Sequence, residues 1–361
     1  MNRKRLLFFH NTLPEYRVGF WNSLNKDVEL IVAILEPELQ SKVYGFAIGE
    51  IEFKIVYVNN NLNDLIMNTD AVILPPIDDK KCIFAALAIK KICRKQRIPY
   101  YFWTEKWEAP SEKTPKVKKI KNFIQRKIYA YCSKGAKKYI AAGIKAKEYL
   151  INIGISQKNI EIVVDSSTSP IGNAIDIRRK YDIDFDKKII LYLGRLIERK
   201  GCDVLIKSCK GYLKQWNAVL LICGDGEFAD KCRIMADDHE SIILAGKIQP
   251  YERRCYYQQS DVFILPSIIK DGVVEGWGLA INEALECGTP TITTTAVGAG
   301  YDLINIHTGI MIEENNEMEL KNAIEDILKK GYDRMSIVEY YQSYSISNMA
   351  KNFARCVFTN S

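Results

Sequence analysis

The chain has no long hydrophobic run. None of the apolar stretches in its 361 residues reaches the ~18 residues that a membrane-spanning helix needs. The start, MNRKRLLFFHNTLPEYR, is basic and then apolar, but its apolar part is too short for a signal peptide and predicts a first β-strand that leads into a loop. We therefore expect a cytoplasmic chain.

Clustered metal ligands and a dinucleotide fingerprint are also missing. The ten cysteines are scattered without C-x-x-C spacing, and with three histidines they form no zinc pattern. Cys223 and Cys287 lie in apolar segments, as reduced core cysteines do. No G-x-G-x-x-G sequence marks a dinucleotide site. We expect no structural disulfide, no metal and no other cofactor.

What is present is an ordinary globular composition with unevenly distributed charge. Hydrophobic residues make up 47% and charged residues 26% of the chain, and its length suits two domains with separate cores. Residues 1–175 hold 28 Lys and Arg against 17 Asp and Glu, a net charge of +11, whereas the remainder has a net charge of −4. The basic half either faces an anionic partner or serves solubility.

Short runs of Ile, Val and Leu alternate with helical stretches, which predicts parallel sheets covered on both faces. The polar stretch 165–177 predicts the join between two domains. The fold class is therefore α/β, with two Rossmann-like domains, 1–170 and 171–361, whose parallel sheets are expected to face a central cleft. Ligands are expected in this cleft between the domains, at the carboxyl ends of the strands. We expect strands at 5–10, 28–35, 53–58, 71–75, 99–103, 138–142, 160–164, 188–194, 219–224, 241–246, 262–266 and 290–294.

Two cations follow the first strand of the second half. Gly194 ends that strand, Arg195 follows it, and Lys200 stands before Gly201 and a helix. Cations beyond a strand end and beside a helix start can grip a diphosphate, although a solvated loop with stray charges is the alternative. The sequence 224–226, Gly-Asp-Gly, predicts a tight turn after the next strand, where a ligand can also approach the backbone.

The stretch EGWGLAINEALECGTP, residues 275–290, places a carboxylate on a buried helix. Leu279, Glu283 and Cys287 are four apart and so share one side of that helix. A buried carboxylate needs hydrogen-bond donors, and Glu283 can accept two hydrogen bonds from a vicinal diol such as ribose. A buried glutamate–arginine ion pair is the alternative.

The start of this helix suits a phosphate. Gly276 and Gly278 flank it, and a helix start offers backbone N–H groups and a positive dipole end. Eight helical residues span roughly 12 Å, comparable with a diphosphate and one attached ring. Glu275 could therefore bind the hydroxyls of a sugar at the other end of such a ligand, unless it is only a loop carboxylate.

Together these segments resemble the GT-B retaining glycosyltransferases of family 4, the group 1 glycosyl transferases. Gly194-Arg195 with Lys200-Gly201, then CGDGE, LPS, EGWGLAINEALECGTPTI and HTGIMI, occur in the family's order across roughly residues 186–330. Glu275 and Glu283 match the family's pair of glutamates in E-x7-E spacing. The first half resembles the family more weakly, through NTLPEYRVGFWNSL and residues 137–164.

The resemblance implies retaining transfer of a sugar from a nucleotide-sugar donor to an acceptor hydroxyl, without a metal. It also implies that the last helix returns to the first domain. Arg195 and Lys200, beside Gly194, would bind the donor diphosphate and stabilise it as the leaving group. Glu275 with Gly276 would contact the donor sugar, at the helix start formed by Gly278 and Leu279. Glu283 would bind the ribose.

One family feature is absent from the first half. Many members carry a histidine after the fourth or fifth strand, near the transferred sugar, but the corresponding stretch here reads YFWTEKWEAP and includes Glu105 and Lys106. His10, at the end of the first strand, could approach the site or be a loop residue. The sequence leaves open which of these residues, if any, takes that role.

The basic stretch 113–138 carries ten Lys and Arg and no Asp or Glu. Within it, an apolar stripe follows helical spacing: Val117, Ile120, Ile124, Ile128 and Tyr131. The stripe either packs onto its own domain, with the lysines solvated, or rests on anionic lipid as a peripheral membrane surface. Lipid contact would favour a lipid-linked acceptor or a growing polysaccharide. No nucleic-acid-binding module accompanies the charge, so we expect no nucleic acid partner.

Two other functions suit the same residues. A sugar-nucleotide 2-epimerase of the same fold would interconvert donor epimers and release no glycoside. A non-catalytic nucleotide-sugar-binding subunit would bind nucleotide but would neither hydrolyse nor transfer the donor by itself. The intact pair of glutamates and cations argues against the second alternative.

Overall fold

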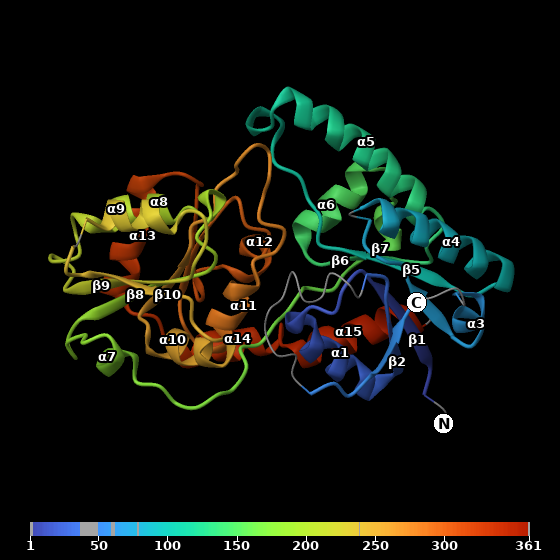
Figure 1. Cartoon of the computed structure of the whole chain (residues 1–361), viewed down its shortest axis with the longest axis horizontal. Coiled ribbons are helices and arrows are strands. Elements are labelled where there is room, and N and C mark those ends of the chain that lie inside the picture. The colour runs from blue at the N-terminus through green and yellow to red at the C-terminus, as the bar shows by residue number, and fades with distance from the viewer. Residues whose placement is uncertain (1–2, 37–49, 59–61, 78, 238, 360–361) are drawn as a thin grey trace. The chain divides into compact units, whose positions relative to one another are not determined.

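The computed structural model describes residues 3–36, 50–58, 62–77, 79–237 and 239–359. Its contacts divide the chain into two compact units (Figure 1). Unit 1 consists of Met1–Trp107, Lys116–Ser167 and Tyr344–Ser361, and unit 2 consists of Glu108–Pro115 and Thr168–Ser343. The boundary at Ser167 and Thr168 lies inside the polar stretch 165–177.

Unit 1 is built on a seven-stranded sheet in the order β3-β2-β1-β4-β5-β6-β7, and its paired strands run parallel. The strands are β1 (Arg5–His10), β2 (Glu29–Ile34), β3 (Lys54–Tyr57), β4 (Ala71–Ile73), β5 (Tyr100–Thr104), β6 (Tyr139–Ala141) and β7 (Ile160–Ile162). The helices are α1 (Glu15–Asp27), α3 (Leu62–Met67), α4 (Lys80–Gln96), α5 (Lys116–Ser133), α6 (Ile144–Asn152) and α15 (Ile346–Phe358), with a 3-10 turn η3 (Gln157–Asn159).

Unit 2 is built on a six-stranded parallel sheet in the order β10-β9-β8-β11-β12-β13. The strands are β8 (Lys188–Leu193), β9 (Ala218–Cys223), β10 (Ile242–Gly246), β11 (Val262–Leu265), β12 (Thr291–Thr294) and β13 (Gly309–Ile312). The helices are α7 (Ile177–Lys180), α8 (Cys202–Lys210), α9 (Ala229–Ala236), α10 (Arg253–Gln259), α11 (Leu279–Glu286), α12 (Gly300–Leu303), α13 (Glu317–Lys330) and α14 (Arg334–Gln342). Three 3-10 turns are η2 (Ser111–Lys113), η4 (Glu198–Lys200) and η5 (Pro250–Glu252).

The prediction of parallel α/β sheets is confirmed, and a strand lies at each of the twelve expected positions. One strand, β13, was not expected. It has only four residues, GIMI, and pairs with β12 in the register Ile292 to Ile310. So short an apolar run carries little periodicity of its own, and it becomes a strand because a buried neighbour supplies the hydrogen bonds.

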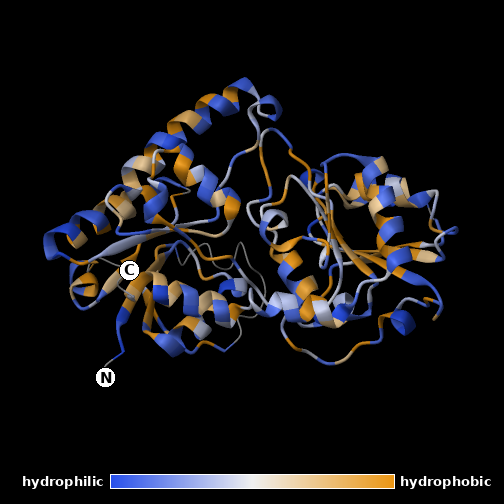
Figure 2. Cartoon of the chain, turned by 180° about the vertical axis from the view of Figure 1, so that it is seen from behind, coloured by the Kyte–Doolittle hydropathy of each residue, from blue (hydrophilic) through white to orange (hydrophobic). Residues whose placement is uncertain are grey.

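Each unit has its own hydrophobic core, formed between its sheet and its helices. In unit 1 the core is rich in aromatic residues, and Phe353 of α15 stacks on Phe8 of β1 with ring centroids 5.8 Å apart. The Tyr101 hydroxyl donates to the Val357 carbonyl at 2.6 Å, so α15 belongs to this unit. In unit 2 the buried core is mainly aliphatic, and Figure 2 shows hydrophobic strands in its sheet. None of the helices in the described ranges is both long and apolar enough to cross a bilayer.

The strand order of each sheet reverses beside its first strand. β1 lies between β2 and β4, and β8 lies between β9 and β11. At such a reversal the connections leave to opposite sides, and sheets of this type bind ligands there, beyond the carboxyl ends of the strands. We call these positions the switch points of unit 1 and unit 2. His10 lies at the first and Gly194 at the second.

Candidate functional site

Three loops of unit 2 pack closely at its switch point. A Cβ on Gly224, after β9, would lie 1.8 Å from the carbonyl oxygen of Gly194, after β8. Gly201 has φ of 67°, and a Cβ there would lie 2.0 Å from a carbonyl oxygen of the loop after β11. The same loop donates the Ile268 N–H to the Arg199 carbonyl at 2.8 Å. Glycine therefore permits the close approach of these loops.

Glu275 lies between two cations of the β8 loop. Its Oε2 is 2.6 Å from Arg199 Nη1 and 2.7 Å from Lys200 Nζ. Its backbone N–H donates to the Ala296 carbonyl at 2.9 Å, which fixes the residue beside β12. Burial by itself raises the pKa of Glu275, but Lys200 and Arg199 outweigh burial and lower it. Burial also lowers the pKa of Lys200 against the opposite effect of Glu275.

The cluster has more positive than negative charge. Arg195, in the same loop, is exposed and adds to the burial effect that lowers the pKa of Lys200. Within the described residues Arg195 has no ion-pair partner, and Glu198 is paired with Lys270 at 2.9 Å. Arg199 and Lys200 thus share the carboxylate of Glu275, and Arg195 adds a third positive charge near Lys200. Such an excess favours an anion with several oxygens, because charge-assisted hydrogen bonds to it are strong.

Helix α11 begins beside this cluster, where the glycines predict it. Gly276, Trp277 and Gly278 precede its first residue, Leu279. Gly278 has φ of 103°, and a Cβ there would lie 2.7 Å from a side-chain carbon of the β12–α12 loop. The Trp277 indole N–H donates to Asn282 Oδ1 at 2.9 Å and fixes the turn on the helix. The positive end of the α11 dipole therefore lies at this loop.

Glu283, in the middle of α11, already has protein partners. Its Oε1 is 3.4 Å from Arg253 Nη1, and the Tyr257 hydroxyl donates to its Oε2 at 3.1 Å. The residue is only 6% exposed, and burial raises the pKa of its carboxyl group. The structure therefore contains the glutamate–arginine ion pair that the sequence leaves as an alternative. A ribose diol would have to share or replace these donors.

Unit 1 has a second polar cluster at its switch point. Burial and the charge of Arg17 lower the pKa of His10 to about 4, and its Nδ1 lies 2.8 Å from the Thr12 carbonyl oxygen. The imidazole is therefore neutral and donates its Nδ1–H to that oxygen. Arg17 makes a buried two-bond ion pair with Asp165, with Nη2 2.8 Å from Oδ2.

The two candidates after β5 differ in their surroundings. Glu105 Oε2 lies 3.7 Å from Arg17 Nη2, so Glu105 borders the same arginine as His10. Lys106 Nζ instead lies 4.6 Å from the ring centroid of Tyr129 on α5. Glu105 and His10 are thus the two candidates that the fold brings to one cluster.

Sequence reasoning missed several residues of both clusters. Arg199 is adjacent to Lys200, so the run ERKG contains a signal for it. Tyr257 lies 26 positions from Glu283, and Arg17 lies 148 positions from Asp165. No local spacing predicts pairs so distant in the chain, because the fold alone brings them together.

One group among the described residues could hold a metal ion. Glu36, Asp79 and Cys82 each place a ligand atom within 4.8 Å of the others. Asp79 Oδ1, however, accepts the Cys82 backbone N–H at 2.8 Å, as the N-cap of α4. The cap accounts for the position of Asp79, and we assign no metal here.

The chain has similarity to glycosyltransferases. Residues 173–344 match the family model described as glycosyl transferases group 1. The uncharacterized glycosyltransferase MJ1607 of Methanocaldococcus jannaschii is 27% identical over 223 residues, which cover 59% of this chain and 52% of that protein. A GDP-mannose-dependent alpha-(1-6)-phosphatidylinositol monomannoside mannosyltransferase of Mycolicibacterium smegmatis is 27% identical over 158 residues, which cover 42% of this chain and 41% of that protein. The chain spans about half the length of the curated relatives it matches.

Among solved structures, the crystal structure of Anabaena Alr3699/HepE in complex with UDP has a TM-score of 0.73. The sequences are 13% identical, and the match covers 98% of this chain and 98% of that chain. At this identity the likeness shows the fold. Residues 173–344 thus match the model of the group 1 glycosyl transferases, and the two parallel-sheet units of the chain have the GT-B fold.

Proposed function

We propose that the chain is a family 4 retaining glycosyltransferase that moves a sugar from a nucleotide-sugar donor to an acceptor hydroxyl. The bond between the anomeric carbon and the diphosphate oxygen breaks, and the acceptor oxygen bonds to the anomeric carbon and loses its proton. The observation that carries this proposal is the excess of cations at the switch point of unit 2. Arg199 and Lys200 share the carboxylate of Glu275 there, and Arg195 adds a third positive charge near Lys200.

The cations have a direct role in this chemistry. The leaving diphosphate gains negative charge as its bond to the sugar breaks, and Arg195 and Lys200 offset that charge. Gly194 and the start of α11, from Gly276 to Leu279, border the phosphates. Glu275, held by Arg199 and Lys200, contacts the sugar hydroxyls, and Glu283 contacts the ribose by displacing a donor of its present pair.

We propose a lipid-linked molecule or a growing polysaccharide as the acceptor, used at the cytoplasmic face of a membrane. The mannosyltransferase relative carries a phosphatidylinositol derivative in its name, and a basic, partly apolar surface of unit 1 supports an anionic membrane partner. His10 and Glu105, which share Arg17 at the switch point of unit 1, are candidates to act near the transferred sugar.

A screen of nucleotide-sugars by thermal shift tests the donor. A donor that binds the native protein raises its apparent melting temperature. Transfer is then tested with that donor and candidate acceptors, and the configuration at the anomeric carbon of the product is determined by NMR. An inverted product would contradict the retaining mechanism. No stabilisation by any nucleotide-sugar would contradict the donor site.

The same assay separates the alternatives. A sugar-nucleotide 2-epimerase would interconvert donor epimers without forming a glycoside, and a binding subunit would be stabilised by donor but turn over none of it. We also propose that the reaction needs no divalent metal, because the protein cations already oppose the diphosphate. Activity that disappears with chelator and returns with added magnesium would contradict this.

A further inference from the structure

Helix α5 packs on the rest of unit 1 through a side other than the apolar stripe that the sequence predicts. The buried residues of α5 are Asn122, Tyr129, Cys132 and Ser133. Most of the apolar stripe instead points outward: Val117 and Ile120 are 66% and 63% exposed, and Phe123, beside the stripe, is 60% exposed. Ile124 and Tyr131 are exposed as well. Of the two alternatives that the sequence leaves open, packing onto its own domain therefore does not hold for Val117, Ile120 and Ile124, whereas the half-buried Ile128 lies against α4.

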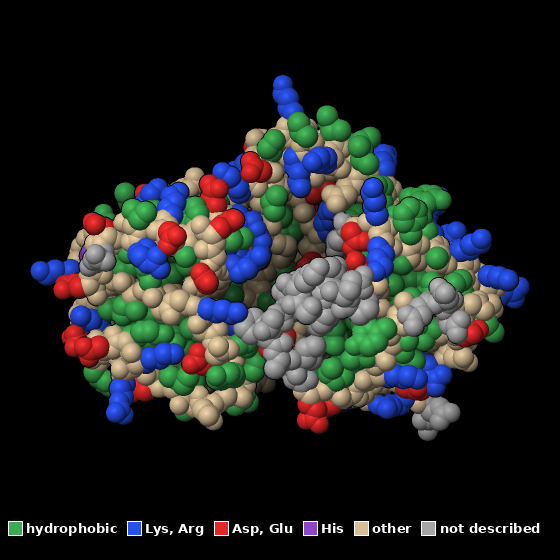
Figure 3. Space-filling model, viewed as in Figure 1, with side chains coloured by type: hydrophobic (Ala, Val, Ile, Leu, Met, Phe, Trp, Pro, Cys, Tyr) green, Lys and Arg blue, Asp and Glu red, His purple; other side chains and the backbone are tan. Residues whose placement is uncertain are grey.

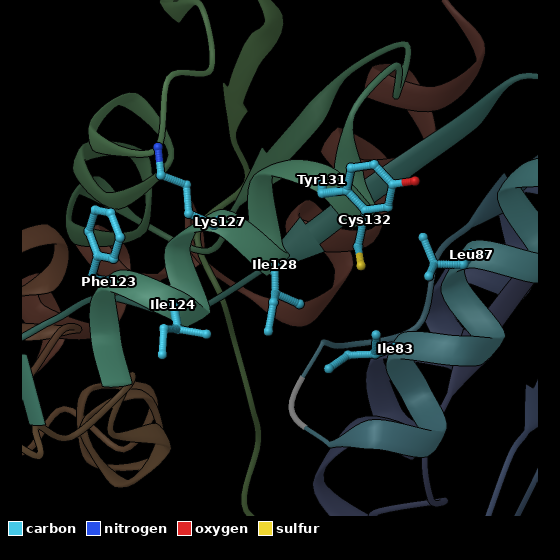
Figure 4. A pocket seen from close by; sticks show the side chains of 8 residues that line it. All are labelled: Ile83, Leu87, Phe123, Ile124, Lys127, Ile128, Tyr131 and Cys132. Carbon is cyan, nitrogen blue, oxygen red and sulfur yellow. The ribbon is translucent and has the colours of Figure 1, made fainter. Parts of the chain in front are cut away.

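Helix α4 lies against α5 and extends this apolar surface. Figure 4 shows Ile83 and Leu87 of α4 opposite Ile128 and Cys132 of α5. These side chains line a pocket of about 450 Å³, a volume within the range of small-molecule sites. Phe84, three residues before Leu87 and so beside it on α4, is 70% exposed.

Cations surround this apolar surface, and neither helix contains an Asp or Glu. Each helix has five exposed basic residues, which on α4 are Lys80, Lys81, Lys91, Arg94 and Lys95, and on α5 are Lys116, Lys119, Lys121, Arg126 and Lys127. In Figure 3, blue cations and green hydrophobic side chains lie next to one another over α5. The ends of the basic stretch 113–138 do not contribute, because Lys113 pairs with Glu314 at 2.8 Å and Lys138 pairs with Glu161 at 2.7 Å.

We propose that the α4–α5 surface docks onto an anionic phospholipid bilayer, with hydrocarbon of the lipid entering the pocket between the helices. Exposed hydrophobic side chains would enter the interface while the surrounding lysines meet lipid phosphates. Charge complementarity selects this partner, since ten exposed cations without a neighbouring acid on their helices match a surface of anionic headgroups. The proposal names the membrane partner of the proposed glycosyltransferase, but vesicle binding requires no donor or turnover.

Vesicle flotation at low salt tests the proposal. The parent chain should float with vesicles of equimolar phosphatidylglycerol and phosphatidylcholine, remain behind with phosphatidylcholine alone, and release as salt rises. Replacing Lys116, Lys119, Lys121 and Lys127 with Gln should weaken binding on the order of 100-fold or more, given the attraction of each basic group to an anionic surface. The matched control replaces Lys158, Lys214, Lys330 and Lys351, which are exposed lysines outside both helices, and should bind like the parent.

A second pair of variants tests the apolar contact. Ile120→Gln with Phe123→Gln keeps every charge and should weaken vesicle binding at least about tenfold, because the interface no longer buries these side chains. The control, Phe185→Gln with Ile306→Gln, removes two exposed hydrophobic residues of unit 2 and should leave vesicle binding unchanged. Since all four side chains are exposed, these substitutions should not affect folding. Stabilisation by nucleoside diphosphate, measured in parallel, checks that the variants are folded.

Three outcomes would overturn the proposal. In the first, the parent chain does not bind anionic vesicles at low salt. In the second, the α5 variants and their controls lose vesicle binding to the same extent. In the third, the parent chain does not bind vesicles but self-associates in sedimentation, and substitution of Ile120 and Phe123 abolishes this self-association. That result would assign the surface to contact with a second copy of the chain. Failure of donor binding with intact vesicle binding would contradict the proposed function alone.

Discussion

At the scale of single residues, the proposed donor site depends on how Glu275 is shared between two cations. Glu275 accepts from both Arg199 and Lys200, so neither cation is fully neutralised by it. Arg195 is exposed beside them and has no ion pair among the residues described. Because Arg195 contributes little to the folded structure by itself, it is the residue whose removal reports most directly on a bound anion.

We therefore predict that Arg195→Ala weakens nucleoside diphosphate binding by about 1.5–3 kcal/mol, the value of a hydrogen bond to a charged group. Lys200→Ala should weaken it too, but should also lower stability because Glu275 loses a buried partner. Isothermal titration calorimetry measures both. The bare nucleoside should bind parent and Arg195→Ala alike, and Arg233→Ala, on α9, should leave the affinity unchanged. If Arg195→Ala weakens binding of the nucleoside and of the nucleoside diphosphate equally, Arg195 does not contact the phosphates.

The two glutamates should behave differently. We predict that Glu283→Gln weakens nucleoside and nucleoside diphosphate in the same proportion, whereas Glu275→Gln lowers turnover more than affinity. The reason is that Glu283 is assigned to the ribose and Glu275 to the sugar. Calorimetry with both ligands and steady-state kinetics decide between the roles. If Glu283→Gln lowers the free energy of unfolding but not affinity, its pair with Arg253 is purely structural.

His10 should make stability depend on pH. Burial and Arg17 lower its folded-state pKa from 6.5 to about 4, so the unfolded chain binds more protons between these values. Its contribution is complete above about pH 6.5 and is lost as pH falls toward about 4, amounting to about 3 kcal/mol. Urea unfolding across this range should show the loss in the parent and a flatter profile in His10→Gln.

At the scale of elements, the site depends on how closely the loops after β8, β9 and β11 approach one another. The β8 loop has to pass beneath a carbonyl oxygen of the β11 loop at Gly201, and this approach places Arg199 and Lys200 beside Glu275. The position requires a left-handed backbone and no side chain. In the sequence, the only sign that Gly201 has this special conformation is that it stands directly before a predicted helix.

We predict that Gly201→Ala lowers the free energy of unfolding by at least about 1–3 kcal/mol, the cost of a strained backbone residue, and also weakens diphosphate binding. The added Cβ would lie 2.0 Å from a backbone oxygen, which cannot move as a flexible side chain can. Urea denaturation and calorimetry measure the two effects. Gly211→Ala is the matched control, since a Cβ there would meet nothing within 4 Å. Equal stability of the two variants would show that the β8 loop tolerates a side chain.

At the scale of the whole molecule, chain order and spatial order differ. The last helix, α15, follows all of unit 2 in sequence but packs on α1 and on the aromatic core of unit 1. Unit 1 is therefore complete only when the end of the chain has returned to it. The residues that we propose bind the donor, in contrast, all come from unit 2.

We predict that Phe353→Ala destabilises unit 1 by about 3–5 kcal/mol, because it removes a buried ring that stacks on Phe8. Nucleoside diphosphate should still bind, since its proposed contacts lie in unit 2. Limited proteolysis reports the opening of unit 1, and calorimetry reports ligand binding. Phe185→Ala, at an exposed position, serves as the control. Loss of both stability and nucleotide affinity would show that the donor site depends on an intact α15.

The sequence by itself determined the features that depend on nearby residues. Apolar runs and turn residues placed twelve strands and the helix start at Leu279, because backbone preferences and side-chain periodicity act over a few positions. The glycines and cations from Gly194 to Lys200, with Glu275, carry the resemblance to group 1 glycosyl transferases, and the family model matches residues 173–344. The proposed location of the diphosphate site followed from the rule for parallel sheets.

Tertiary structure decided what depends on residues far apart in the chain. Periodicity shows that Val117, Ile120 and Ile124 share one side of α5, but only the neighbouring elements determine whether that side meets protein or solvent. Likewise, a buried glutamate on α11 signals that it needs donors, but whether these are Arg253 and Tyr257 or a ligand depends on where α10 packs. Burial and ion pairing are properties of surroundings assembled by the whole fold, and no local pattern contains them.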